Sequence, residues 1–161
     1  MDEPTQRQWA EYAVRAINEA FPDETDYRNW PGCQQFLPHA QTCAALIDQW
    51  QFTFPEAGGL CNRVGYYQKD RAQYAEAEIF YQRAIAIGEK TLGLEHPDLA
   101  VWLNNLALLY VEQGKYVEAE PLYQRAIAIN EKVFGPTHHN TILFRKNYEG
   151  LLRQWKKGKG G

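Results

Sequence analysis

Serine is absent from the 161-residue sequence, and cysteine is scarce. Without serine, neither a Ser-His-Asp nor a Ser-Lys nucleophile can be assembled. The three cysteines, Cys33, Cys43 and Cys61, are odd in number and form no CxxC pair. This arrangement disfavours both a disulfide framework and a tetrahedral zinc site. We therefore expect the three cysteines to be buried, reduced thiols.

A surplus of positive charge and a long apolar run are also missing. Seventeen Lys and Arg against 20 Asp and Glu leave a net charge of −3, so no global field attracts nucleic acid or anionic lipid. No window approaches the roughly 18 apolar residues that a membrane span requires, and the opening residues MDEP do not begin a signal peptide. We expect a cytoplasmic protein without a nucleic-acid or membrane partner.

The strongest pattern in the sequence is an internal repeat at an offset of 42 residues. Residues 74–93 (YAEAEIFYQRAIAIGEKTLG) match residues 116–135 (YVEAEPLYQRAIAINEKVFG) at 14 of 20 positions. The same offset aligns residues 60–73 with 102–115 and residues 102–110 with 144–152. The chain is therefore divided into an amino-terminal helical capping region (1–59), a first unit (60–101), a second unit (102–143) and a carboxyl-terminal capping helix with a basic tail (144–161).

Apolar residues within each unit recur at helical spacing, as at positions 103, 106, 107 and 110. Turns are indicated at residues 72–73 and 114–115, so each unit is predicted to be a helical hairpin. Pro121 lies beyond the first turn of its helix and predicts a mild distortion. Before the repeats, helices are predicted from about residue 7 to 21 and from about 34 to 50, with a polar loop over 22–32 between them.

The motifs LNNLALLY (103–110), QGKYVEAE (113–120) and LGLEHPD (92–98) resemble the tetratricopeptide repeat (TPR). Units of 42 rather than 34 residues are similar to the long variant found in kinesin light chains. The resemblance implies an all-α fold, an α-solenoid of TPR helical hairpins in a right-handed superhelix.

A second resemblance concerns AVRAINEAFP (13–22) and WPGCQQFLPHAQTCAALI (30–47). These stretches look like the region that joins a bacterial signalling ATPase of the NB-ARC or STAND type to its repeat array. The sequence contains no GxxxxGK[ST] loop to hold a phosphate. The resemblance therefore implies the sensor part of such a system, without its ATPase.

Repeats of this family line an inner groove with their first helices, where asparagines hydrogen-bond the backbone of an extended peptide. An amide suits this task because it both donates and accepts. Between the apolar positions of the aligned first helices lie the candidate peptide-binding residues Asn62, Arg63, Tyr66, Asn104, Asn105, Lys146 and Asn147. Cations at 63, 69 and 146 favour acidic side chains, and Tyr66 offers an apolar face. The resemblance implies a protein or peptide partner.

Three alternatives to the groove hypothesis stay open. The asparagines could solvate a helix surface or bond across neighbouring helices, and the cations could be ordinary solvated charges. The exposed end of the stack could meet another copy, which would make the chain a self-assembling homo-oligomer. The third alternative is an enzyme using cysteine or carboxylates.

Catalytic and metal sites have little support in the sequence, and we predict none, nor any cofactor. Cys61 aligns with Leu103 and so belongs to the core. His138 and His139 are adjacent in a loop and have no Cys or carboxylate at helical spacing to share a metal. Because His96 aligns with His138, a shared helix-cap role is the better explanation for both. We therefore expect the chain not to be an enzyme.

Overall fold

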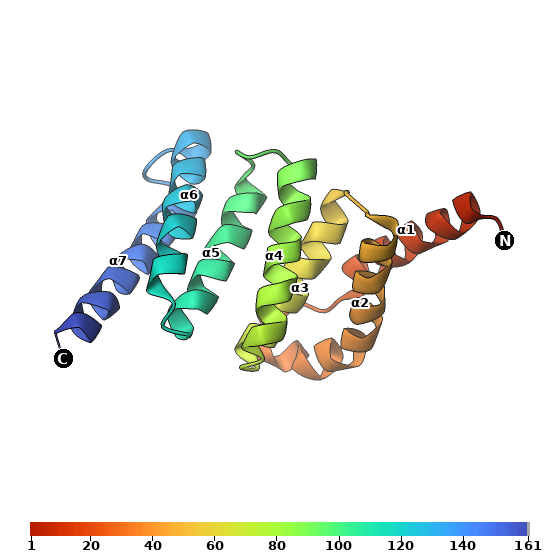
Figure 1. The fold of residues 1–161 in the computed structure, drawn as a ribbon, viewed down its shortest axis with the longest axis horizontal. Coiled ribbons are helices and arrows are strands. Elements are labelled where there is room, and N and C mark those ends of the chain that lie inside the picture. The colour runs from red at the N-terminus through yellow and green to blue at the C-terminus, as the bar shows by residue number, and fades with distance from the viewer. Residues whose placement is uncertain (161) are drawn as a thin grey trace. The chain divides into compact units, whose positions relative to one another are not determined.

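The computed structural model describes residues 1–160. Within that range the regular elements are helical: α1 (Glu3–Ala20), a 3₁₀ turn η1 (Tyr27–Asn29), α2 (Trp30–Trp50), α3 (Pro55–Asp70), α4 (Tyr74–Thr91), α5 (Pro97–Glu112), α6 (Tyr116–Phe134) and α7 (His139–Lys159). This confirms the predicted all-α fold (Figure 1). Among the described residues, no helix is both long enough and apolar enough to cross a bilayer.

The described chain divides into two compact units. Unit 1 runs from Met1 to Thr91 and contains α1 to α4, and unit 2 starts at Leu92 and contains α5 to α7. In unit 1 the hairpin α3–α4 packs side by side, and α1 and α2 pack on each other and on α3. In unit 2, α6 packs between α5 and α7, and α5 also contacts α7 (Figure 1).

The 42-residue period sets where helices begin. The first helices α3, α5 and α7 start at residues 55, 97 and 139, and the second helices α4 and α6 start at 74 and 116. Turns at 71–73 and 113–115 confirm the predicted hairpins. Pro55 and Pro97 occupy the first helical position, where a missing N–H costs nothing. The unit boundaries expected at 60, 102 and 144 therefore fall inside the first helices, and as domain limits they stay a prediction.

Small and aromatic side chains interlock at the centre of each hairpin. Tyr81 on α4 and Tyr123 on α6 are fully buried. A Cβ atom added at Gly65 of α3 would lie 2.9 Å from Cδ1 of the Tyr81 ring, so close helix approach requires glycine there. Cys61 is fully buried beside this contact, as its alignment with Leu103 predicts.

The amino-terminal helices are longer than the sequence predicts. Helix α1 starts at Glu3, where Asp2 accepts a capping hydrogen bond from the Thr5 amide. Helix α2 starts at Trp30 because Pro31 fits its first turn, so the predicted loop over 22–32 is shorter than expected. Pro38 lies inside α2, where its missing N–H removes one backbone hydrogen bond of the helix. The ribbon of α2 is visibly bent in Figure 1. Helix α6 continues through Pro121, which agrees with the mild effect expected there.

Histidines cap two of the repeat helices. His96 Nδ1 accepts a hydrogen bond from the Asp98 amide at 3.1 Å, at the start of α5. His138 Nδ1 accepts one from the Asn140 amide at 3.3 Å, at the start of α7. The predicted helix-cap role is confirmed for both residues.

Candidate functional site

An amide pair joins two of the predicted site residues in unit 2. Asn147 on α7 donates from Nδ2 to Oδ1 of Asn104 on α5, at 3.0 Å. Asn104 is buried and Asn147 is half-buried. The hydrogen bond links successive first helices, so the structure bears out the interpretation that these asparagines bond across neighbouring helices.

Two further predicted residues flank the amide pair. Asn105 follows Asn104 on α5 and is 9% exposed, so only an edge of its side chain meets solvent. Lys146 precedes Asn147 on α7 and is exposed. Unit 2 therefore gathers four of the seven predicted residues on α5 and α7, with one accessible cation among them.

Polar contacts hold α7 in position on α6. Arg145 forms an ion pair with Glu131, and the Tyr148 hydroxyl donates to Oε1 of Glu120 at 2.7 Å. Gln124 Nε2 donates to the same hydroxyl at 3.1 Å. The aligned positions on α5, residues 103 and 106, are buried leucines. The α6–α7 contact is thus more polar than the α5–α6 hairpin, as expected of an end helix.

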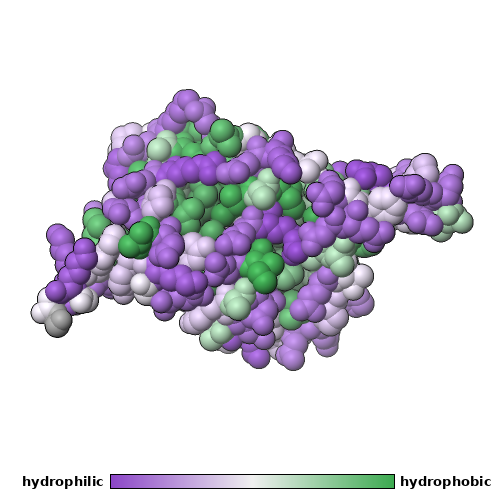
Figure 2. Space-filling view, in the orientation of Figure 1, coloured by the Kyte–Doolittle hydropathy of each residue, from purple (hydrophilic) through white to green (hydrophobic). Residues whose placement is uncertain are grey.

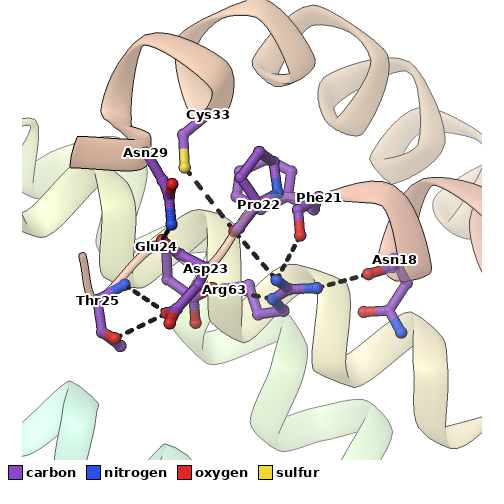
Figure 3. Close-up of polar contacts among 9 residues, drawn as sticks. All are labelled: Asn18, Phe21, Pro22, Asp23, Glu24, Thr25, Asn29, Cys33 and Arg63. Atoms are coloured by element: carbon purple, nitrogen blue, oxygen red, sulfur yellow. Dashed lines mark hydrogen bonds and ion pairs between the residues drawn. The ribbon is translucent and has the colours of Figure 1, made fainter. Parts of the chain in front are cut away.

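In unit 1, the Arg63 side chain is bound by the chain itself (Figure 3). Its Nη1 donates to the Asn18 carbonyl at 2.5 Å, and its Nη2 donates to the carbonyls of Phe21 and Pro22 at 2.5 and 3.0 Å. Its Nε donates to Oε2 of Glu24 at 2.9 Å. The last carbonyls of a helix lack intrahelical partners and carry partial negative charge, so Arg63 satisfies the end of α1.

Sequence reasoning did not find this anchoring role. The peptide hypothesis reserved the Arg63 guanidinium for a partner's acidic group, but its Nε already meets Glu24 of the same chain. The one signal was the departure from asparagine at a position that aligns with Asn105. The structure explains that departure, because an amide has neither the reach nor the number of donors to hold several acceptors at once.

The other predicted residues of unit 1 are also partly buried or in contact with other side chains of the chain. Asn62 is 9% exposed. Tyr66 is half-buried, with Lys69 Nζ 5.4 Å from its ring centroid, and burial raises the pKa of its hydroxyl. Lys69 pairs with Asp70 at 2.8 Å. The predicted cationic edge of this unit is therefore largely neutralised within the chain.

The described part of the chain can be searched for metal-ligating clusters and for an accessible thiol. No group of three or more His, Cys, Asp or Glu side chains converges there in a way that could hold a metal ion. Cys33, Cys43 and Cys61 are free and buried, as expected. Burial raises the pKa of the Cys61 thiol to about 12, so the thiolate required of a nucleophile is not formed at neutral pH.

Comparison with known families assigns the repeats. The model of the tetratricopeptide repeat family matches residues 56–132 and 103–157. A curated relative from Hyaloscypha variabilis, a nucleotide-binding leucine-rich repeat (NLR)-like protein, is 32% identical over 86 residues. That match covers 53% of this chain and 9% of the relative, so the chain spans less than a tenth of the relative's length.

Solved structures share the fold. A Podosopora anserina kinesin-light-chain-like protein with nearly identical TPR-like repeats superposes with a TM-score of 0.64 at 19% identity, covering 94% of this chain and 67% of that chain. BtubC (BKLC) of P. vanneervenii superposes with a TM-score of 0.67 at 15% identity, covering 94% and 66%. These similarities confirm the kinesin-light-chain-like, helical-repeat fold that the sequence predicts.

Proposed function

The chain belongs to the tetratricopeptide repeat family, and from this premise we propose that it binds an extended segment of a partner protein on the α5–α7 face of unit 2. The family's fold is non-catalytic, and its repeats serve protein–protein interaction. The proposal assigns that interaction to the face that carries Asn104, Asn105, Lys146 and Asn147.

The amide pair is the observation that supports this face. Within the described residues, the bond from Asn147 to Asn104 is the one hydrogen bond that either side chain makes. Asn147, which is half-buried, can still accept at Oδ1, and Asn104, which is 4% exposed, has a remaining Nδ2–H donor that a bound segment would have to reach at the edge of the pair. One fixed donor beside one fixed acceptor matches the carbonyl and N–H of a peptide backbone. Because the pair is already ordered, little side-chain entropy is lost on binding.

The neighbours of the pair set what else a bound segment meets. Lys146 is exposed beside Asn147 and offers a cation to an acidic group. Asn105 is 9% exposed, so a bound segment can contact only the edge of its side chain. Arg63 does not take part in the proposed contact, because its donors hold α1. The segment is recognised mainly through its backbone, which permits several sequences to bind.

We also propose that the chain acts by binding and not by catalysis. The most plausible nucleophile by residue type, Cys61, is fully buried and protonated at neutral pH. The NLR-like relative supports a place in a larger signalling protein, where this chain would supply partner recognition. A fused ATPase would carry out the nucleotide chemistry, since this sequence has no phosphate-binding loop.

The test is a selection of nine-residue peptides from a random display library against the full chain, followed by affinity measurement with a selected peptide. Asn147→Ala and Asn105→Ala should each weaken binding by about 0.5 to 1.5 kcal/mol. The fold should persist, as judged by far-UV circular dichroism.

Gln82→Ala provides the matched control, because it shortens an exposed amide on α4, outside the proposed face. It should leave the affinity unchanged. Equal losses in the control and in Asn147→Ala, or a full-affinity Asn147→Ala variant, would refute the assignment of the site.

A further inference from the structure

One face of α1 exposes an uncommon amount of apolar surface. Trp9 is 60% exposed and Tyr12 is 52% exposed, and their rings meet edge to face at 6.1 Å. Ala16 and Glu19 are also exposed and, at seven and ten residues after Trp9, share its face. A hollow of about 380 Å³ beside Trp9 is bordered by Leu46 and other residues of α1 and α2. Two neighbouring exposed aromatic rings beside a hollow are a candidate docking surface.

Helix α7 presents a face with the same spacing. Leu143 is 47% exposed, and Lys146, Gly150 and Arg153 follow at three, seven and ten residues. Lys146 and Arg153 are exposed, and Gly150 is partly exposed. The carboxyl-terminal tip of α7 is coloured as strongly hydrophilic in Figure 2, in keeping with the lysines there. This face points away from the residues that pack on α6.

We propose that α7 of one copy of this chain docks in parallel on the exposed face of α1 of a second copy. The equal spacing of the two faces pairs residues of complementary kind: Trp9 with Leu143, Tyr12 with Lys146, Ala16 with Gly150, and Glu19 with Arg153. The pairs supply one apolar contact, one cation–π contact, one place for close backbone approach and one ion pair.

Charge complementarity favours a second copy as the occupant. Residues 1–29 carry seven Asp and Glu against three Arg, while α7 carries six Lys and Arg against one Glu. The two ends of the chain therefore attract one another, although the whole chain has a net charge of only −3. A contact between unlike ends is heterologous, and it repeats from copy to copy unless the chain of copies closes.

Gly150 gives independent support. Glycine inside a helix is destabilising relative to alanine, and among residues 1–160 no atom beyond the neighbouring residues and nearby backbone of α7 itself lies within 4 Å of the position that a Gly150 Cβ would take. Packing inside the chain therefore does not require glycine there. Close approach of another helix does, and the small Ala16 stands opposite it in the proposed register.

The test is sedimentation velocity of the full chain over a concentration series at low salt. We expect reversible, weak association that decreases with added salt. Arg153→Glu and Glu19→Lys each place like charges in register and should each lower the association constant by about tenfold. Mixing the two variants restores opposite charges at every contact between unlike chains. The equimolar mixture should therefore associate about as well as the unaltered chain.

The controls separate this proposal from its rivals. Lys90→Glu reverses an exposed charge on α4 and should leave association unchanged. Gly150→Leu should abolish association with the helix content retained. A monomer at every concentration, or a mixture that does not recover, overturns the proposal. If Arg153→Glu lowers the association constant and Glu19→Lys does not, the proposal is also overturned. That result would mean that α7 binds an acidic surface other than the α1 face. Lys146 belongs to both proposed faces, so peptide affinity is measured at protein concentrations at which the chain is monomeric. There, neither variant alters Asn105, Lys146 or Asn147, and the peptide affinity should stay unchanged.

Discussion

At the scale of single residues, the two hairpin turns differ at one aligned position, where the first turn has alanine and the second has glycine. Ala72, in the turn between α3 and α4, has a φ of 58°, and the aligned Gly114, between α5 and α6, has a φ of 72°. Left-handed backbone brings Cβ too close to the carbonyl oxygen and costs a non-glycine residue about 1 to 2 kcal/mol. The first turn thus carries a strain that the second avoids.

Ala72→Gly should raise the free energy of unfolding by about 0.5 to 1 kcal/mol. The relief of strain exceeds the entropy that glycine adds to the unfolded chain, which is roughly 0.4 to 1 kcal/mol. Urea unfolding followed by circular dichroism measures the change. Gly114→Ala is the matched control and should shift stability in the opposite direction. If Ala72→Gly lowers stability, the turn is not strained.

The residue scale is also where sequence reasoning reached its limit. The 42-residue offset put Asn104 and Asn147 at neighbouring first-helix positions, and they do meet. The sequence offered Arg63 either as a cation at the groove edge or as an ordinary charge, and did not indicate the partners that its donors meet 39 to 45 residues away, in a loop and a helix end. No local pattern encodes such distant backbone acceptors. Their positions depend on how α1 packs on α3.

At the scale of elements, two of the three first helices, α5 and α7, begin at a repeated histidine cap, whereas α3 begins after Phe54, which makes no side-chain cap hydrogen bond. His96 precedes α5 and His138 precedes α7, and each accepts an amide hydrogen bond at Nδ1. Periodicity therefore sufficed to predict that these hairpins exist. It misplaced the start of α2, because a proline close to a helix start reads as loop in a sequence and acts as a first-turn residue in the structure.

His96→Ala should lower the free energy of unfolding by about 1 kcal/mol, because the Asp98 amide loses its acceptor. His96→Asn should lose much less, since asparagine caps helices well. His39→Ala, at an exposed position inside α2, is the matched control and should be nearly neutral. Thermal and urea unfolding report all three. Similar losses for the alanine and asparagine variants would show that the hydrogen bond does not carry the effect.

At the scale of the whole molecule, burial raises the pKa values of several thiols and tyrosine hydroxyls, in both units. Desolvation raises the pKa values of the Cys33, Cys43 and Cys61 thiols and of the Tyr66 and Tyr123 hydroxyls. Each of these groups is neutral when protonated. The folded state therefore holds its protons to a higher pH than the unfolded state does, and stability depends on pH with a defined sign.

The free energy of unfolding should accordingly fall as pH rises above the unfolded thiol pKa of about 8.5. Below that pH the thiols are protonated in both states, so they add no pH dependence and the full stability is kept. Cys61, with its pKa raised to about 12, should alone remove about 2 kcal/mol between pH 8 and pH 10. Urea unfolding at each pH measures the slope. Cys61→Ala leaves a cavity and lowers stability at every pH, but it should flatten the slope. An equally steep slope in Cys61→Ala would show that this thiol is not the buried titrating group.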